Sequence, residues 1–469
     1  MSNEISGKKI AKNVSLSILA QVVSLLVAFV LNMIVPKFIT EYEYAYWQTY
    51  SLYANYTGIL HFGLLDGIVL RYSQFDYDQL DKKRMRSQFA VLLIVDSICT
   101  AIIMGISALL FTDQYFLVGL FVAFSVITRN IIKYAVYTLQ STNRIKQYVT
   151  ASIIQKVFYG LFVVTALILK RRDFYWICAG ELLGEIVAFI WTVKFNKDIY
   201  FGKLDSKNEI FKETKANLFA GVFLLISNWS AMFTIGAAKM IIQWRWDELT
   251  FGKVAFSFSV TSLFLTFVSA ISVVLFPALK RMKQDHLPDL YVKIRSVLSP
   301  ILVSVLILYY PGAWILSLWL PKYNVSVSYL GLLLPIIIYR TRVSLLTNNY
   351  LKAYRKERTL LLINIVSVVI AILGGAFICY VLNSIDLMLI YTVLTFMLMS
   401  IFAEFAVCKL VKTNFVKENI YEAIMSIAFI ICARYLSLLF GLIVYAALLL
   451  IYLFLNRKVI LAYVKKIKK

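Results

Sequence analysis

Long apolar runs recur along the whole 469-residue chain, and they constrain its fold more than any other feature. A helix needs about 20 apolar residues to cross the hydrocarbon core of a bilayer. Hydrophobic residues make up 61% of the sequence and charged residues only 16%, which leaves too few polar side chains to cover soluble domains of this size. The sequence therefore predicts an all-α polytopic membrane protein. It argues against a soluble enzyme, a secreted disulfide scaffold and a nucleic-acid-binding domain.

Apolar runs bounded by charged residues predict about fourteen transmembrane helices. The last run is long enough for two short spans if it breaks near residues 433–437. The predicted spans are 14–36, 47–70, 89–111, 116–140, 148–169, 175–193, 218–242, 254–278, 298–320, 327–351, 360–381, 387–408 and the pair within 420–455.

Lysine and arginine residues are concentrated on one side of the predicted membrane. With a cytoplasmic N-terminus, the inner segments hold 34 of them and the outer segments 8. Short cytoplasmic loops carry such an excess, so the bias predicts that both termini are cytoplasmic and favours an even number of spans. The same loops account for the net charge of +23 without a nucleic-acid partner.

The predicted loops lack the residues of an enzyme. A membrane glycan polymerase or glycosyltransferase would need a large loop with carboxylates or histidines, and the predicted outer loops are short. The chain has no nucleotide-binding glycine motif, only two histidines, and five cysteines without metal-ligand spacing. We therefore expect a protein that moves molecules, that is not an enzyme, and that needs no metal or cofactor.

Matching segments at an interval of 210 to 211 residues indicate a duplicated six-span unit. Arg71 matches Arg281 at the ends of spans two and eight, and Arg129 matches Arg340 in spans four and ten. Because six is even, both halves keep one orientation and are related by a pseudo-two-fold axis along the membrane normal. The predicted parts are a six-helix lobe at 1–193, a cytoplasmic loop at 194–217, a second six-helix lobe at 218–408, and a helical hairpin with a basic tail at 409–469.

The same segments carry a family resemblance. FGLLDGIVLRYSQ at the end of span two, LFPALKRM at the end of span eight, and a fourth span that runs into a short basic turn resemble the O-antigen and capsule polysaccharide flippases. These belong to the multidrug/oligosaccharidyl-lipid/polysaccharide exporter superfamily, and the resemblance covers essentially the whole chain. It implies two lobes around a central cavity with alternating access, in the bacterial cytoplasmic (inner) membrane. The implied cargo is an undecaprenyl-diphosphate-linked oligosaccharide, moved to the outer leaflet for surface polysaccharide biosynthesis, with membrane lipids and polysaccharide assembly proteins as partners.

Basic residues inside the predicted spans mark a candidate binding site. A Lys or Arg at a helix centre costs roughly 2.5–3.5 kcal/mol to insert and usually faces a cavity or a partner. Arg129 and Lys133 share one helix face, and Arg340 is the counterpart of Arg129. Arginine forks phosphate oxygens and lysine adds a point charge, so the three are predicted to bind the diphosphate. In the alternative interpretation, Lys133 only extends to the inner membrane surface and Arg129 bonds to backbone carbonyls. Arg342, two residues from Arg340, is predicted to be structural or to extend toward the inner membrane surface.

Acidic residues suggest an ion-coupling group in the first lobe. Lys156 and Glu185 lie at equal predicted depth in spans five and six, and Glu181 lies one turn outward of Glu185. A carboxylate in a low dielectric can carry a proton. A static ion pair between Lys156 and Glu185 explains the pattern equally well.

Two charged residues flank the inner end of span two. Asp66 and Arg71 are predicted to form a structural pair at the cavity mouth, with direct substrate contact as the alternative. His61, slightly deeper, is predicted to be a hydrogen-bonded core residue rather than a proton relay. Asp96 and Glu404 are left without a predicted partner.

Two related functions fit the same features. A cation-coupled multidrug exporter of the superfamily would need an acidic cavity, and Arg129 and Arg340 weigh against it. A peptidoglycan-precursor flippase would share a basic cavity, and the sequence does not separate it from the leading interpretation.

Overall fold

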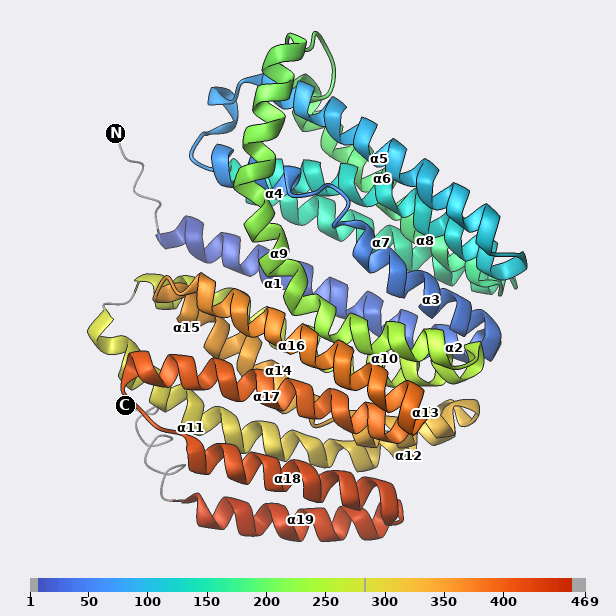
Figure 1. Ribbon diagram of the computed structural model, residues 1–469, viewed down its shortest axis with the longest axis vertical. Coiled ribbons are helices and arrows are strands. Elements are labelled where there is room, and N and C mark those ends of the chain that lie inside the picture. Colours follow the sequence, from blue (N-terminus) through green and yellow to red (C-terminus); the bar gives the residue numbers. More distant parts are fainter. Residues whose placement is uncertain (1–6, 282–283, 458–469) are drawn as a thin grey trace. The chain divides into compact units, whose positions relative to one another are not determined.

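The computed structural model describes residues 7–281 and 284–457, and this part of the chain is helical (Figure 1). The basic tail predicted after Arg457 and the first residues of the chain lie outside the described residues. By its internal contacts the chain divides into two compact units, Met1–Trp229 and Ser230–Lys469. The boundary falls inside one long helix, α9 (Lys207–Arg245).

The first unit contains the helices of the first six predicted spans and the beginning of α9. α5 packs along α6, and α8 packs against both α6 and α7 (Figure 1). The elements are α1 (Gly7–Phe29), the π-helical η1 (Val30–Ile34), α2 (Val35–Phe38), α3 (Glu41–Thr57), α4 (Leu64–Tyr72), η2 (Tyr77–Gln79), α5 (Lys82–Leu110), α6 (Asp113–Ser141), α7 (Ile145–Ile168), α8 (Phe174–Asn196) and η3 (Lys197–Ile199).

The second unit continues with α9 and holds the remaining helices. Its central contacts join α10 to α13 and α16 to α17. The elements are α10 (Glu248–Arg281), η4 (Gln284–His286), α11 (Leu287–Val305), η5 (Leu306–Leu308), α12 (Tyr309–Trp319), η6 (Pro321–Tyr323), α13 (Asn324–Leu333), α14 (Ile336–Thr341), the π-helical η7 (Arg342–Thr347), α15 (Asn348–Ala353), α16 (Glu357–Phe377), η8 (Ile378–Leu382), α17 (Ile385–Val411), α18 (Val416–Tyr435) and α19 (Leu438–Leu455).

Short polar side chains fix the starts of several helices. Thr40 accepts from the Glu43 amide at the start of α3, and Asp81 accepts from the Arg84 amide at the start of α5. Ser437 does the same for α19. These caps satisfy amides that have no partner within the helix, so the helices begin where the sequence offers a cap.

The second predicted span, 47–70, is broken into α3 and α4. The turn between them ends at Gly63, whose φ of +94° favours glycine. A Cβ on Gly67 would overlap the carbonyl oxygen of Asn217 on α9, and a Cβ on Gly221 would overlap the carbonyl oxygen of Gly63. Small residues let two helix backbones approach this closely. The break therefore serves the packing of α4 against α9, which an apolar run does not reveal.

Part of the predicted loop at 194–217 is helical. α9 begins at Lys207, ten residues before the predicted end of the loop. The reason is that its first turns carry Glu213 and Asn217, both buried, whose side chains bind Arg71. Polar residues there are paired within the protein and do not mark exposed loop.

A proline bends the tenth predicted span. The segments Pro321–Leu333 and Ile336–Ala353 meet at 54° around Pro335. Proline removes a backbone donor and clashes with the preceding turn, which explains the bend. The π-helical η7 follows within the same span, directly after Arg340 and Thr341.

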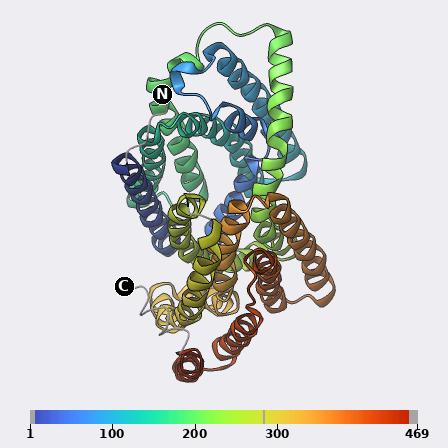
Figure 2. The ribbon, with the colours of Figure 1, turned by 90° about the vertical axis from the view of Figure 1, so that its left-hand side faces the viewer.

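The last apolar stretch forms a helical hairpin. α18 and α19 meet at Leu436 and Ser437, within the predicted break, and lie side by side in Figure 1 and Figure 2. α18 packs on α11 and α13, and α19 packs on α12. The hairpin is therefore part of the second unit.

The structure supports fewer membrane spans than the sequence predicts. Ten helices are long and apolar enough to cross a membrane, or twelve if each of two bent pairs is one span. α3, α4 and α18 are not among them, because α3 is short and polar, α4 has only nine residues, and α18 carries four charged residues. Among the described residues the predicted count of fourteen is thus not confirmed.

Candidate functional site

Arg129 on α6 lies in a buried ion cluster with two glutamates of α8. Its Nη2 is 2.7 Å from Glu181 Oε1, and its Nε is 3.3 Å from Glu185 Oε1. Its Nη1 donates to the carbonyl of Ala54 on α3 at 2.5 Å, a backbone bond of the kind foreseen in the alternative interpretation. The cluster has two carboxylates for one guanidinium, so when all are ionised it carries one negative charge in excess.

Glu185 is not paired with Lys156. Its second oxygen, Oε2, accepts from the hydroxyl of Thr128 at 2.5 Å, and no ion pair joins it to Lys156 in the described part of the chain. Thr128 and Arg129 are adjacent on α6, which packs directly along α8. The predicted pair between α7 and α8 is wrong because α6 supplies the partners instead.

Lys133, one turn along α6, faces the turn that joins α3 to α4. Its Nζ is 3.3 Å from His61 Nε2 and 5.6 Å from the ring centroids of both Tyr137 and Trp229. His61 is 1% exposed and its Nδ1 accepts from the Gly63 amide, which confirms the predicted hydrogen-bonded core residue. Lys133 is held by this turn and by aromatic rings.

Asp66 and Arg71 point to different neighbours. Asp66 Oδ2 lies 3.7 Å from His61 Nε2. Arg71 binds Glu213 of α9 through two contacts, Nη1 to Oε1 at 2.5 Å and Nη2 to Oε2 at 3.3 Å, and donates to Asn217. The predicted Asp66–Arg71 pair is wrong because the two residues are five positions apart on α4, with one face toward the His61 turn and the other toward α9.

Asp96, for which the sequence offered no partner, is hydrogen-bonded on the neighbouring helix. The Asn130 amide donates to its Oδ1 at 2.8 Å, and both residues are buried. Asn130 directly follows Arg129, so one short stretch of α6 binds acidic residues of both α5 and α8.

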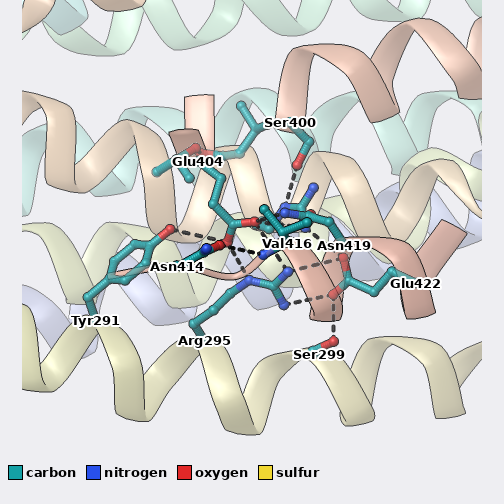
Figure 3. A network of polar contacts seen from close by, with 12 residues as sticks. Tyr291, Arg295, Ser299, Ser400, Glu404, Asn414, Val416, Asn419 and Glu422 are labelled. Carbon is teal, nitrogen blue, oxygen red and sulfur yellow. Dashed lines mark hydrogen bonds and ion pairs between the residues drawn. The ribbon is translucent and has the colours of Figure 1, made fainter. Parts of the chain in front are cut away.

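In the second unit, two arginines and two glutamates form a closed ring of buried charges (Figure 3). Arg295 of α11 contacts Glu404 of α17 and lies 2.7 Å from Glu422 of α18. Arg342 of η7 is 2.6 Å from Glu422 and 3.3 Å from Glu404. Each side chain is 1% exposed. The ring is neutral overall and joins four segments of the unit.

Neighbouring polar groups complete the ring. Figure 3 shows Ser299 donating to Glu422 and Tyr291 donating to Glu404. Ser400 and Asn419 accept from Arg342. Arg342 is thus a structural residue, which agrees with the first of its two predicted roles and not with extension to the membrane surface.

Sequence reasoning missed two members of this ring. It placed Arg295 in an inner loop and gave Glu422 no role, because basic residues at the inner ends of spans usually follow the positive-inside rule. Ser299 lies four residues after Arg295, so the two share a helix face in an otherwise apolar run. That polar face is the signal that a buried partner exists.

Arg340 and Arg342 both contact α17, but Arg342 lies in the ion ring and Arg340 packs beside an aromatic ring. Its guanidinium carbon lies 5.5 Å from the ring centroid of Phe396 on α17. The repeat interval of 211 carries Glu181 and Glu185 onto Thr392 and Phe396. At this predicted interval, Thr392 and Phe396 of α17 correspond in sequence to the two glutamates of α8.

No metal site is formed by the residues that the structure describes, where no group of three or more His, Cys, Asp or Glu is close enough to hold an ion.

Comparison with known proteins gives the fold but no sequence family. No family model and no curated protein matches the sequence. Solved structures do match. A structure of the lipid II flippase MurJ, in an inward closed conformation, has a TM-score of 0.64 at 12% identity and covers 96% of this chain and all of its own.

The descriptions of two further matching structures name the MOP superfamily. An inward-facing multidrug resistance MATE family transporter of the MOP superfamily has a TM-score of 0.61 at 14% identity, covering 84% of this chain and all of its own. A MOP superfamily transporter from Pyrococcus furiosus has a TM-score of 0.50 at 12% identity, covering 86% of this chain and 97% of its own. Likeness at this identity shows the fold alone. The chain is a multi-pass integral membrane protein with the fold of the MOP superfamily transporters.

Proposed function

We propose that the protein is a flippase that moves an undecaprenyl-diphosphate-linked oligosaccharide from the inner to the outer leaflet by alternating access. The observation that carries the proposal is the structural match to a lipid II flippase, which covers 96% of this chain. Arg340 lies on α14, within the tenth predicted span, beside the Phe396 ring of α17. A guanidinium binds phosphate oxygens in two-point geometry, and a basic side chain within a span is a candidate group for an anionic cargo.

The proposal assigns different roles to the two arginines. Arg340 contacts the diphosphate, and the Arg129–Glu181–Glu185 cluster serves ion coupling. Two points stay predictions from the sequence. One is that Arg129 and Lys133 join Arg340 around one diphosphate. The other is that Asp66 and Arg71 line a cavity mouth. The bacterial cytoplasmic membrane, cytoplasmic termini and polysaccharide assembly partners belong to the same proposal.

The extent of the structural match favours a lipid-linked cargo over a small drug. The lipid II flippase structure covers 96% of this chain, while the MATE transporter covers 84%. A peptidoglycan precursor is thus a close alternative cargo, and it presents the same diphosphate chemistry to Arg340. The second candidate function is a cation-coupled multidrug exporter, favoured by the excess negative charge around Arg129.

Complementation of a bacterial strain that lacks its own flippase tests the proposal. We expect Arg340→Ala to reduce surface glycan by more than about tenfold, because charge-assisted hydrogen bonds to the diphosphate are lost. Arg340→Lys should restore part of the signal. Arg434→Ala is the matched control, since Arg434 forms a partly exposed pair with Asp386 and should leave surface glycan unchanged.

Each outcome is informative once immunoblots show equal protein in the membrane. Wild-type surface glycan in the Arg340→Ala strain would remove Arg340 from the binding site. Resistance to cationic drugs without surface glycan, in the strain with the wild-type protein, would favour the exporter instead.

A further inference from the structure

The turn between α3 and α4 holds a histidine whose hydrogen bonds define its protonation. His61 Nδ1 accepts from the Gly63 amide at 3.1 Å. A ring nitrogen that accepts a hydrogen bond carries no proton, so the proton of the neutral ring lies on Nε2. Nε2 is the atom that faces Lys133 Nζ, at 3.3 Å.

The contact between Nε2 and Nζ has a different meaning for each protonation state of the lysine. An ammonium group has three donors and no acceptor, so it cannot accept from Nε2–H. The neutral amine of Lys133 can, through its lone pair. In the deprotonated state of the site, Nε2–H donates to the uncharged amine of Lys133 at 3.3 Å, with Asp66 Oδ2 at 3.7 Å as a second acceptor.

Adding one proton to Lys133 Nζ disrupts the arrangement. The new ammonium and Nε2–H are then two donors facing each other. His61 relieves this by turning its ring toward Asp66 or by holding its proton on Nδ1, and in both cases the Gly63 amide loses its acceptor. Asp66, whose Oδ2 lies 3.7 Å from Nε2, supplies the negative charge that balances the ammonium.

The groups around Lys133 and its neighbour Arg129 come from several helices that pack on α6, among them α3, whose Tyr50 lies beside Arg129. Trp229 of α9 contributes a ring face to which a cation is attracted. The charged and titratable neighbours are His61 in the turn, Asp66 on α4, Arg129 and Tyr137 on α6, Tyr148 of α7 beside Tyr137, Asp96 of α5 bound to Asn130, and Glu181 and Glu185 of α8 bound to Arg129.

The Gly63 amide lies at the close contact between α4 and α9. Gly63 begins α4 in a left-handed conformation, and its carbonyl oxygen and the Gly67 amide both meet the backbone of α9 at Gly221. A change in the turn at Gly63 therefore acts directly on the contact between α4 and α9.

We propose that Lys133, His61 and Asp66 form a proton-binding site whose occupancy sets the conformation of the α3–α4 turn. One proton binds the Nζ lone pair, the Gly63 amide is released, and α4 shifts against α9. Titratable groups within membrane proteins often serve as proton carriers, and here the carrier is coupled to a helix break. The inference rests on the protein being a transporter and is independent of the cargo.

Hydrogen exchange of the full-length protein in nanodiscs tests the site without any cargo. Exchange of the peptide covering residues 61–67 is followed between about pH 5 and pH 9 and corrected for the intrinsic pH dependence. In the wild type, we expect the corrected rate to rise by about tenfold toward low pH, the change expected for losing one intramolecular hydrogen bond.

Two variants and a control separate the site from general effects. Lys133→Met cannot take up the proton and should show slow exchange at every pH. Lys133→Arg is always charged and should show fast exchange at every pH, and it keeps the test available if the methionine variant does not fold. Lys239→Met, a lysine of the second unit beside the Phe258 ring, should retain the wild-type step.

The proposal is overturned if the wild type shows no step, if Lys133→Met keeps the step, or if Lys133→Arg exchanges slowly at low and high pH. None of these exchange measurements involves transport. A negative result here therefore contradicts the proton-binding site without contradicting the flippase proposal, and a negative flippase assay leaves the proton-binding site standing.

Discussion

Removing one acid from the buried ring of the second unit should strongly destabilise the protein. Glu422 accepts from Arg295 at 2.7 and 3.2 Å, from Arg342 at 2.6 Å, and from Ser299 at 2.5 Å. Glu422→Gln keeps the volume but leaves two guanidinium groups with one carboxylate, which is an uncompensated buried charge. Breaking a buried ion pair in this way costs about 3–5 kcal/mol. For a unit of this size, that corresponds to a fall in the melting temperature of roughly 6–20 °C.

Thermal unfolding in detergent, followed by size-exclusion chromatography of the fluorescent-tagged protein, measures the loss. Glu418→Gln, one turn earlier on α18 and outside the ring, is the matched control and should change stability by less than about 0.5 kcal/mol. In the double variant Glu422→Gln with Arg342→Met, the ring again has a net charge of zero, because one arginine and one glutamate remain. We expect the double variant to lose less than the sum of the single variants, by about 1–3 kcal/mol.

Two results would refute this reasoning. A melting temperature for Glu422→Gln equal to that of the control would show that the ring does not stabilise the unit. Additive effects in the double variant would show that the two residues act separately and not as one charge-balanced ring.

Further predictions concern the contact between α4 and α9. Gly67→Ala should lower stability by about 1–3 kcal/mol, since its Cβ would overlap the Asn217 carbonyl, whereas Gly105→Ala, with open space around it, should be neutral in the same thermal assay. Equal melting temperatures for the two variants would contradict the close helix contact. Arg71→Ala should increase hydrogen exchange at the start of α9 by up to about tenfold, because Glu213 loses its two-point partner. Unchanged exchange there would show that the pair does not hold α9.

The positions of most helices follow from the sequence because the bilayer demands apolar runs of a fixed length. The break before Ser437 and the bend at Pro335 were also predictable, since a capping residue and a missing backbone donor are local signals. The break before Gly63 was not. It arises from close contact with Gly221, far along the chain, and only the folded structure brings the two glycines together.

Charged partners were harder to predict than charged positions. The sequence indicates that Arg129, Lys133 and Glu185 lie within spans, but the partner depends on how each helix is rotated. Equal depth favoured a Lys156–Glu185 pair, yet α6 rather than α7 presents its polar face to Glu185. Depth follows from counting residues, whereas rotation follows from packing.

The central claim is that the cargo carries a diphosphate on a lipid. The most direct measurement is translocation by the purified wild-type protein in liposomes, with a fluorescent undecaprenyl-diphosphate-linked oligosaccharide in one set and a fluorescent lipophilic cation in another. We predict that the protein accelerates movement of the anionic lipid across the bilayer and leaves the cation unmoved. Transport of the cation, with no movement of the diphosphate lipid above protein-free liposomes, would contradict the account.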